Sequence, residues 1–179
     1  QKHTTFNNRY GYGLYLSSKS YVSLDKLNFL RYNYGINCYS DSNNNTITSA
    51  TCNSNKYGIY YYTSNNNTVT SATCNSNSQY GIYYNNNCNN STITSATCNS
   101  NNSYGIYYNN NCNNSTITSA TCNSNDYGIV YDLSSNNTIT SATCNSNMCG
   151  IYYYNSSNNT ITSATCNSND YGIVYDLSS

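Results

Sequence analysis

A single heptapeptide, Thr-Ile-Thr-Ser-Ala-Thr-Cys, recurs through most of this chain of 179 residues and most constrains its fold. The copies, one of them carrying Val69 in place of isoleucine, begin at Thr46, Thr68, Thr92, Thr116, Thr138 and Thr160. A Tyr-Gly-Ile motif usually follows each copy. The associated glycines are 22 to 24 residues apart, at Gly13, Gly35, Gly58, Gly81, Gly105, Gly128, Gly150 and Gly172. Self-similarity at a fixed period of this length indicates stacked structural repeats.

The repeat is too short for helical solenoids, whose units run to roughly 33–47 residues. It also lacks the Leu-x-x-Leu-x-Leu frame of leucine-rich repeats. Thr, Ile, Val and Tyr favour strands, and the Asn, Ser and Gly clusters favour turns. We therefore predict an all-β fold: a single-stranded, right-handed parallel β-helix (β-solenoid) of about eight coils, with the hand expected from the usual crossover bias. Residues 1–45 form divergent N-terminal coils, and residues 46–179 form regular repeats with an incomplete last coil, in one continuous domain.

The divergent first unit predicts which positions face inward. Aligned on the glycines, Leu24, Leu27 and Phe29 fall at the positions of Ile47, Ala50 and Cys52. Large apolar residues replace one another at buried positions, so these columns are expected in the core. The same alignment places Leu14 and Leu16 in the columns of Ile59 and Tyr61, and residues that alternate with the core positions are expected to face outward.

Charge argues against nucleic acid as a partner. Six basic and six acidic residues cancel, and only 7% of residues are charged. A neutral chain has no electrostatic attraction to nucleic acid and little charge repulsion between copies. We therefore expect a homo-oligomer or polymer. No apolar stretch is long enough for a transmembrane segment.

Ten cysteines with a single histidine, His3, indicate an extracellular or cell-surface protein. Six of them form one column: Cys52, Cys74, Cys98, Cys122, Cys144 and Cys166. This column has three interpretations: small buried apolar residues, disulfides between successive coils, or a metal site. The first is favoured, because metal-binding thiolates usually come in closely spaced sets. Cys88 and Cys112, in identical turns of consecutive coils, are a candidate disulfide. Cys38 and Cys149 are expected either to meet an interior cysteine or to link chains.

Asparagine also recurs in columns. Six asparagines begin an Asn-x-Ser/Thr glycosylation sequence, at Asn44, Asn66, Asn90, Asn114, Asn136 and Asn158. Glycans on every coil would crowd one another, so partial glycosylation is the alternative to hydrogen-bonded asparagine ladders. A second set suits such ladders better: Asn55, Asn77, Asn101, Asn125, Asn147 and Asn169.

Paired threonines are expected to project outward from six coils, at Thr46, Thr48, Thr68, Thr70, Thr92, Thr94, Thr116, Thr118, Thr138, Thr140, Thr160 and Thr162. A regular threonine array resembles the ice-binding faces of antifreeze solenoids, although threonine is also simply a good exposed strand residue. An aromatic stripe of Tyr60, Tyr83, Tyr107 and Tyr152, interrupted by Val130 and Val174, suits either sugar rings or packing between solenoids.

Enzymatic chemistry is not predicted. The chain has no glutamate, and its basic residues end at Lys56. Asp126, Asp132, Asp170 and Asp176 therefore have no basic partner nearby in sequence, and they fit solvated turn positions. We predict no catalytic residue, no metal site and no cofactor.

The run Asn-Asn-Thr-Ile-Thr-x-x-x-Cys-x-x-Asn-x-Tyr-Gly-Ile-Tyr-Tyr resembles the repeats of NosD-like right-handed parallel β-helix proteins, over nearly the whole chain from Gly11 to Ser179. Cys52 stands where those repeats carry Ile, and Tyr61 where they often carry Leu. NosD-like proteins are associated with copper delivery in the periplasm, and this sequence has no His or Met ligand set. Similar repeats fill large secreted surface proteins of archaea and some bacteria.

The resemblance and the neutral repeats together predict a non-catalytic extracellular structural protein that self-assembles into a cell-surface filament, sheath or surface layer. Two alternatives stay open: an ice-binding solenoid that uses the threonine pairs, and a carbohydrate-binding module that uses the tyrosines.

Overall fold

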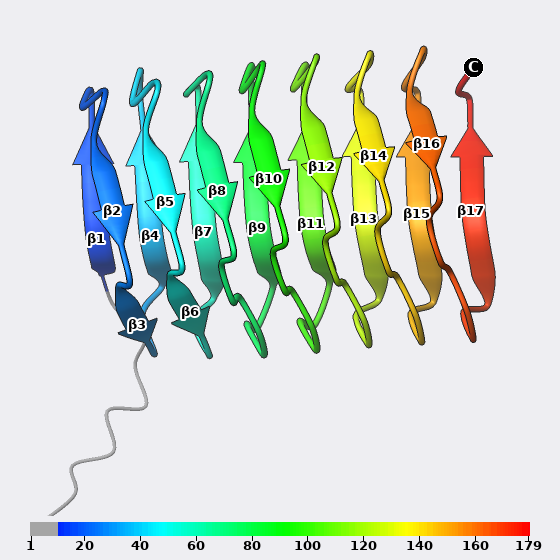
Figure 1. Ribbon diagram of the computed structural model, residues 1–179, viewed down its shortest axis with the longest axis horizontal. Coiled ribbons are helices and arrows are strands. Elements are labelled where there is room, and N and C mark those ends of the chain that lie inside the picture. Colours follow the sequence, from blue (N-terminus) through cyan, green and yellow to red (C-terminus); the bar gives the residue numbers. More distant parts are fainter. Residues whose placement is uncertain (1–10) are drawn as a thin grey trace, which may run out of the picture.

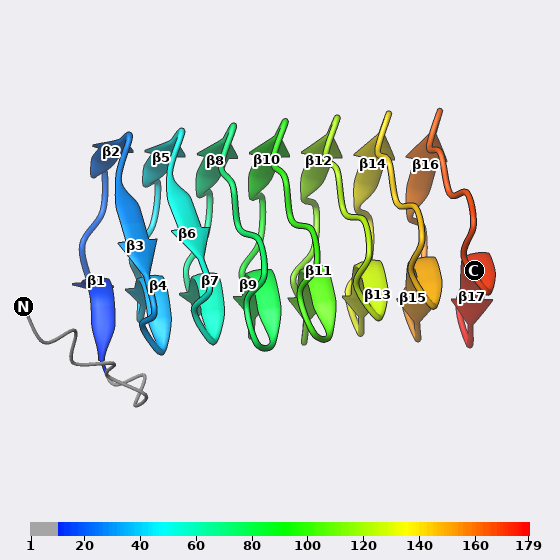
Figure 2. The same cartoon turned by 90° about the horizontal axis from the view of Figure 1, so that it is seen from below.

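The computed structural model describes residues 11–179, and within that range all regular structure is β-strand. The coils stack along one axis, each passing through the same three faces (Figures 1 and 2). The part of residue range 1–45 that precedes Gly11, and with it His3, lies outside the described residues.

The main sheet has eight parallel strands, one from each successive coil. In spatial order they are β1 (Tyr12–Ser17), β4 (Tyr34–Tyr39), β7 (Tyr57–Tyr62), β9 (Tyr80–Asn85), β11 (Tyr104–Asn109), β13 (Tyr127–Asp132), β15 (Cys149–Tyr154) and β17 (Tyr171–Asp176). Equivalent repeat positions pair directly, as Ile82 with Ile106 and Tyr83 with Tyr107. Neighbours in space are therefore equivalent positions of consecutive repeats.

A second parallel sheet has seven short strands. They are β2 (Ser23–Asp25), β5 (Thr46–Thr48), β8 (Thr68–Thr70), β10 (Thr92–Thr94), β12 (Thr116–Thr118), β14 (Thr138–Thr140) and β16 (Thr160–Thr162). A third face consists of β3 (Asn28–Leu30) and β6 (Thr51–Asn53), continued by single bridges from Thr51 through Thr73 to Thr165. The predicted parallel β-solenoid is confirmed, with about seven complete turns against the eight coils expected.

The interior consists of the columns that the divergent first unit predicted. Leu24 pairs in register with Ile47, and Phe29 pairs with Cys52. Ile47, Cys52 and Ile59 have no exposed surface, and Ala50 is 2% exposed. Burying an isoleucine side chain contributes about 1.5–3 kcal/mol, and every complete coil repeats that contribution against its neighbours.

A column of tyrosines also lies inside the solenoid. Tyr61, Tyr84, Tyr108, Tyr131 and Tyr153 are fully buried. Consecutive rings stack at centroid distances from 4.5 Å, between Tyr61 and Tyr84, to 5.4 Å, between Tyr131 and Tyr153. The hydroxyls of Tyr108 and Tyr131 have no hydrogen-bond partner among the described residues. The rings therefore stabilise the core, whereas these two hydroxyls oppose burial.

Asparagine ladders close the turn beside the cysteine column. The backbone N–H of Asn77 donates to Asn101 Oδ1 at 3.0 Å, and that of Asn101 donates to Asn125 Oδ1 at 2.8 Å. This confirms the ladder predicted for Asn55 and its equivalents. A second ladder, which was not predicted, runs in the opposite direction: the N–H of Asn99 donates to Asn75 Oδ1 at 2.7 Å. These bonds satisfy backbone groups that the short strands leave unpaired.

The glycine column is needed because the coils approach closely beside the cysteine column. A Cβ at Gly105 would lie 2.6 Å from the carbonyl oxygen of Gly128 and 2.9 Å from Cβ of Cys122. At Gly172 the nearest atoms to an added Cβ are 3.8 and 3.9 Å away.

We therefore expect Gly105→Ala to destabilise the protein by at least ~2 kcal/mol, because a backbone carbonyl must move, and Gly172→Ala to be nearly neutral. Thermal unfolding followed by circular dichroism checks the pair. Equal melting temperatures for the two variants would contradict the close packing described here.

Tyr108→Phe is expected to raise stability by ~1 kcal/mol, because it removes a buried hydroxyl that lacks a partner and keeps the stacked ring. Tyr107→Phe is the matched control: it removes a hydroxyl that donates to Asp132, and no gain is expected. The melting temperatures of the two variants are the measurement. A lower melting temperature for Tyr108→Phe than for the unaltered chain would show that the hydroxyl is satisfied in solution.

Candidate functional site

The outer surface of the eight-stranded sheet carries most of the tyrosines. Along a typical strand such as β9, Tyr80, Tyr83 and Asn85 face outward, while Ile82 and Tyr84 are buried. We call this surface the tyrosine face. Its tyrosines are Tyr12, Tyr15, Tyr34, Tyr39, Tyr57, Tyr60, Tyr62, Tyr80, Tyr83, Tyr104, Tyr107, Tyr127, Tyr152, Tyr154 and Tyr171.

Two tyrosine columns run side by side along the tyrosine face. In the first, the rings of Tyr34, Tyr57, Tyr80, Tyr104 and Tyr127 follow one another at centroid distances of 4.9 to 5.3 Å. In the second, Tyr83 lies 5.1 Å from Tyr60 and 5.0 Å from Tyr107. Contacts between the columns, such as 4.5 Å from Tyr104 to Tyr107, join them into an aromatic layer over β7, β9 and β11, and Val130 interrupts the second column on β13.

The hydroxyls of the second column are held by polar side chains one coil further on. Asn85 Nδ2 donates to Tyr60 Oη at 3.2 Å, and Tyr107 Oη donates to Asp132 Oδ2 at 2.9 Å. Tyr152 Oη similarly donates to Asp176 Oδ2 at 2.9 Å. The rings are therefore fixed by stacking and by hydrogen bonds.

The charged groups of this face are two carboxylates and, at Tyr57, the Lys56 ammonium, whose Nζ lies 4.9 Å from the centroid of the Tyr57 ring. Among the strands of the eight-stranded sheet, only β13 and β17 carry an acidic residue, Asp132 and Asp176, and none carries Lys or Arg. Burial against neighbouring rings raises the pKa of Tyr60 to about 12. Tyr60 is consequently neutral at physiological pH, and the surface presents the exposed parts of tyrosine rings, hydroxyls, two carboxylates and one ammonium.

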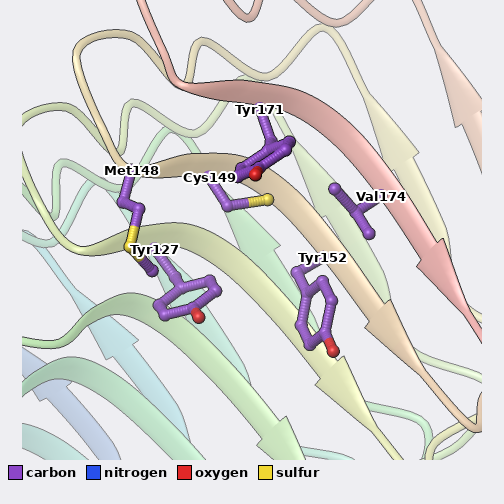
Figure 3. Close-up of a pocket in the computed structure, with 6 residues that line it drawn as sticks. All are labelled: Tyr127, Met148, Cys149, Tyr152, Tyr171 and Val174. Carbon is purple, nitrogen blue, oxygen red and sulfur yellow. The ribbon is translucent and has the colours of Figure 1, made fainter.

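One hollow interrupts the first column. Cys149 pairs in register between Tyr127 and Tyr171, where the other strands of the sheet carry tyrosine. A cavity of about 200 Å³ lies there, lined by Tyr127, Met148, Cys149, Tyr152, Tyr171 and Val174. The sulfur of Cys149 points in among the surrounding rings (Figure 3). We call this cavity the Cys149 socket.

The sequence predicted the second column but not the first. Strict alternation from the buried Ile59 would turn Tyr57 inward. Instead Tyr57 pairs with Tyr80 and Ile59 pairs with Ile82, while Gly58 between them is skipped in the pairing. Gly58 is buried, and Tyr57 faces outward. The glycine breaks the two-residue period. The recurring Tyr-Gly step was the available signal, and its effect on side-chain direction was missed.

The main cysteine column lies in the core: five members have no exposed surface, and Cys166 is partly exposed. All ten cysteines are free thiols in the structure, including Cys88 and Cys112, which were a candidate disulfide. Those two occupy a column of buried serines, in which the N–H of Cys88 contacts Cys112 Sγ at 3.3 Å. Cys38 is buried in the column of Tyr61. Burial raises the pKa of the Cys98 thiol, which favours its neutral form.

The threonine pairs lie on the second sheet, and consecutive pairs meet in direct register, as Thr94 with Thr118. Most are half-buried, as is the Thr51–Thr165 bridge column beside them. Ice binding by this surface stays a prediction.

The glycosylation sequences lie in turns. Asn66, Asn90, Asn114, Asn136 and Asn158 are exposed with φ between 55° and 59°, and Asn44 is half-buried. Their occupancy also stays a prediction.

The whole chain matches the family described as periplasmic copper-binding protein (NosD), over residues 1–111 and 108–179. The chain belongs to the NosD family. The family description agrees with a location outside the cytoplasm. None of the curated proteins matches the chain significantly. No helix long and apolar enough to cross a membrane occurs in residues 11–179.

Solved structures of two epimerases of alginate or mannuronan and of a phage tailspike domain share the fold. The A-module of mannuronan C-5 epimerase AlgE4 from Azotobacter vinelandii aligns with a TM-score of 0.77 at 16% identity, over 81% of this chain and 41% of that one. The periplasmic alginate epimerase AlgG aligns at 0.71 and 14%, over 92% and 48%. The enzymatically active domain of bacteriophage CBA120 tailspike protein 2 aligns at 0.68 and 17%, over 80% and 24%. The chain spans less than half of each of these structures.

These similarities overturn two predictions from the sequence. The predicted non-catalytic, self-assembling structural protein was wrong, because the solved proteins of matching shape are epimerases and an enzymatically active tailspike domain. The prediction that the chain is not an enzyme was wrong for the same reason. Sequence repetition determines the fold and neutral charge affects solubility. Neither property says whether the chain catalyses a reaction.

The described residues do not fit the copper that the family description implies. No group of three or more His, Cys, Asp or Glu side chains in residues 11–179 is placed to hold a metal ion. The main cysteine column contributes one thiol from each coil to a close-packed core. Each thiol therefore neighbours other thiols of the column only in the coil before and the coil after it.

Proposed function

We propose that this chain is part of a polysaccharide-processing protein and holds an extended sugar chain along the tyrosine face. One observation carries the proposal: tyrosine rings follow one another at 4.9 to 5.3 Å in a line parallel to the solenoid axis. That interval is close to the length of one pyranose unit in an extended polymer. A sugar chain laid along the axis would therefore meet an aromatic ring at each unit.

The chemistry of the face suits sugars. The C–H faces of a pyranose ring are apolar and pack on aromatic rings, while its hydroxyls need hydrogen-bond partners. Tyr62, Asn85 and Asn109 provide donors and acceptors along the edge formed by the last residues of the strands. The rings are held in place before binding, so little side-chain entropy is lost when a ligand binds.

Similar structures support the same class of ligand, since two epimerases that are named for the polysaccharides mannuronan and alginate carry this fold. Association of copies of this chain remains a prediction, and packing through the tyrosine face would compete with the sugar for the same rings. A cell-surface position is likewise proposed rather than established.

The double substitution Tyr83→Ala, Tyr107→Ala is expected to weaken polysaccharide binding ~5- to 150-fold, because stacking on an aromatic ring contributes ~0.5–1.5 kcal/mol per ring. Affinity electrophoresis in gels containing soluble β-linked polysaccharides gives the dissociation constants. Thr118→Ala, on the other sheet, is the control and should migrate like the unaltered chain. Equal retardation of all three proteins would remove the tyrosine face as the binding surface.

We also infer that Asp132 and Asp176 supply acid–base chemistry to the processing step. They are the carboxylates of this face, and they lie two strands apart in one column, with Tyr154 between them. At 4.7–4.9 Å per strand their Cα atoms are about 9.5 Å apart, and both carboxylates accept a hydrogen bond from a tyrosine one coil back, so the two side chains point the same way. Inverting glycosidases hold their two carboxyl groups roughly 6.5–9.5 Å apart.

Asp132→Asn and Asp176→Asn should therefore each lower turnover of a bound polysaccharide at least ~100-fold, with binding changed only slightly. Reducing-end release, measured on the polysaccharides that bind, is the assay. Undiminished turnover in both variants, or no turnover by the unaltered chain on any polysaccharide that it binds, would contradict this assignment.

A further inference from the structure

The first column of the tyrosine face is regular except at β15. It carries tyrosine at Tyr12, Tyr34, Tyr57, Tyr80, Tyr104, Tyr127 and Tyr171, and cysteine only at Cys149. The substitution removes one ring from the aromatic layer, and the Cys149 socket is the space that this ring would fill.

The dimensions of the socket suit one six-membered ring. Tyr127 and Tyr171 belong to strands separated by two strand intervals, or about 9.5 Å. A ring placed midway would lie about 4.75 Å from each neighbour, within the 4.5–7 Å range of stacked rings. Tyr152 forms a side wall, 5.7 Å from Tyr127 between ring centroids, and Val174 forms another.

The floor of the socket is apolar and uncharged. Cys149 is 2% exposed, and its thiol donates to the carbonyl oxygen of Ile151 at 3.5 Å. Burial raises the pKa of this thiol to about 11, so it is a neutral group at physiological pH. The floor therefore offers contact with a C–H face, and polar recognition falls to the rim.

Polar groups lie at the rim. Tyr152 Oη donates to Asp176 Oδ2, and this pair has further capacity to accept hydrogen bonds from sugar hydroxyls. All Lys and Arg residues of the chain precede residue 57, more than ninety positions before Cys149. A uronic acid carboxylate in the socket would find no cation among the lining residues, and the charged group bonded to that lining is the Asp176 carboxylate, which has the same sign.

We propose that the Cys149 socket is an anchoring subsite that takes one uncharged pyranose ring of the polysaccharide, between the rings of Tyr127 and Tyr171. The assignment rests on the proposed function and adds two things to it: the position of the strongest subsite, and a preference for neutral sugars over uronates. In that preference the chain differs from the alginate epimerases whose fold it shares.

Cys149→Tyr tests the subsite, because it completes the column with a residue that neighbouring coils already hold at this position. Isothermal titration with cellohexaose, xylohexaose and mannohexaose should show at least ~10-fold weaker binding than the unaltered chain for the hexasaccharide that binds best. Thr118→Ala, on the other sheet, leaves the socket unchanged and should bind like the unaltered chain. Circular dichroism melts establish that both variants fold.

A hexameric oligouronate, titrated at low salt, should bind at least ~10-fold more weakly than the best neutral hexasaccharide. Binding by Cys149→Tyr that equals or exceeds that of the unaltered chain would overturn the subsite and leave the tyrosine face intact. Preferential binding of the oligouronate would overturn the preference for neutral sugars. Failure of the unaltered chain to bind any polysaccharide or hexasaccharide would overturn both this inference and the proposed function.

Discussion

Parallel pairing of each coil on the next, in register, is the constraint on which the rest of the structure depends. Because equivalent residues are hydrogen-bonded neighbours, every choice in the repeat becomes a column along the whole solenoid. The glycine of each coil allows the backbone of the next coil to approach closely beside the cysteine column. The asparagine of each coil accepts a hydrogen bond from a backbone N–H in the turn of the neighbouring coil. Stability is then roughly a sum of nearest-neighbour terms, and a side chain that packs well once packs well in every coil.

The same constraint explains how a chain with so few charged residues can present a specific surface. Outward tyrosines that would be isolated on a globular protein are multiplied into an aromatic layer, with intervals set by strand spacing. A break in the pattern is then as informative as the pattern. Cys149 on β15 leaves space for one ring in an otherwise unbroken first column, next to Tyr152, whose hydroxyl donates to Asp176.

Much of the fold could be predicted from the sequence, because the period and the divergent first unit identify the buried columns directly: Leu24 against Ile47 and Phe29 against Cys52. The site could be predicted only in part. The stripe through Tyr83 and Tyr107 follows from strand alternation, but the column through Tyr57 does not, since Gly58 breaks the alternation. The socket depends on that missed column. Function was predicted least well, because neutrality and repetition are properties of the scaffold.

The central claim is that a neutral polysaccharide lies on the tyrosine rings of the eight-stranded sheet. Saturation-transfer NMR tests it most directly, with a protein deuterated everywhere except at its tyrosine rings and a neutral hexasaccharide as ligand. We predict transfer from the tyrosine ring protons to the C–H protons on the faces of several consecutive sugar units. A hexasaccharide that binds without receiving magnetisation from the tyrosine rings would contradict the account.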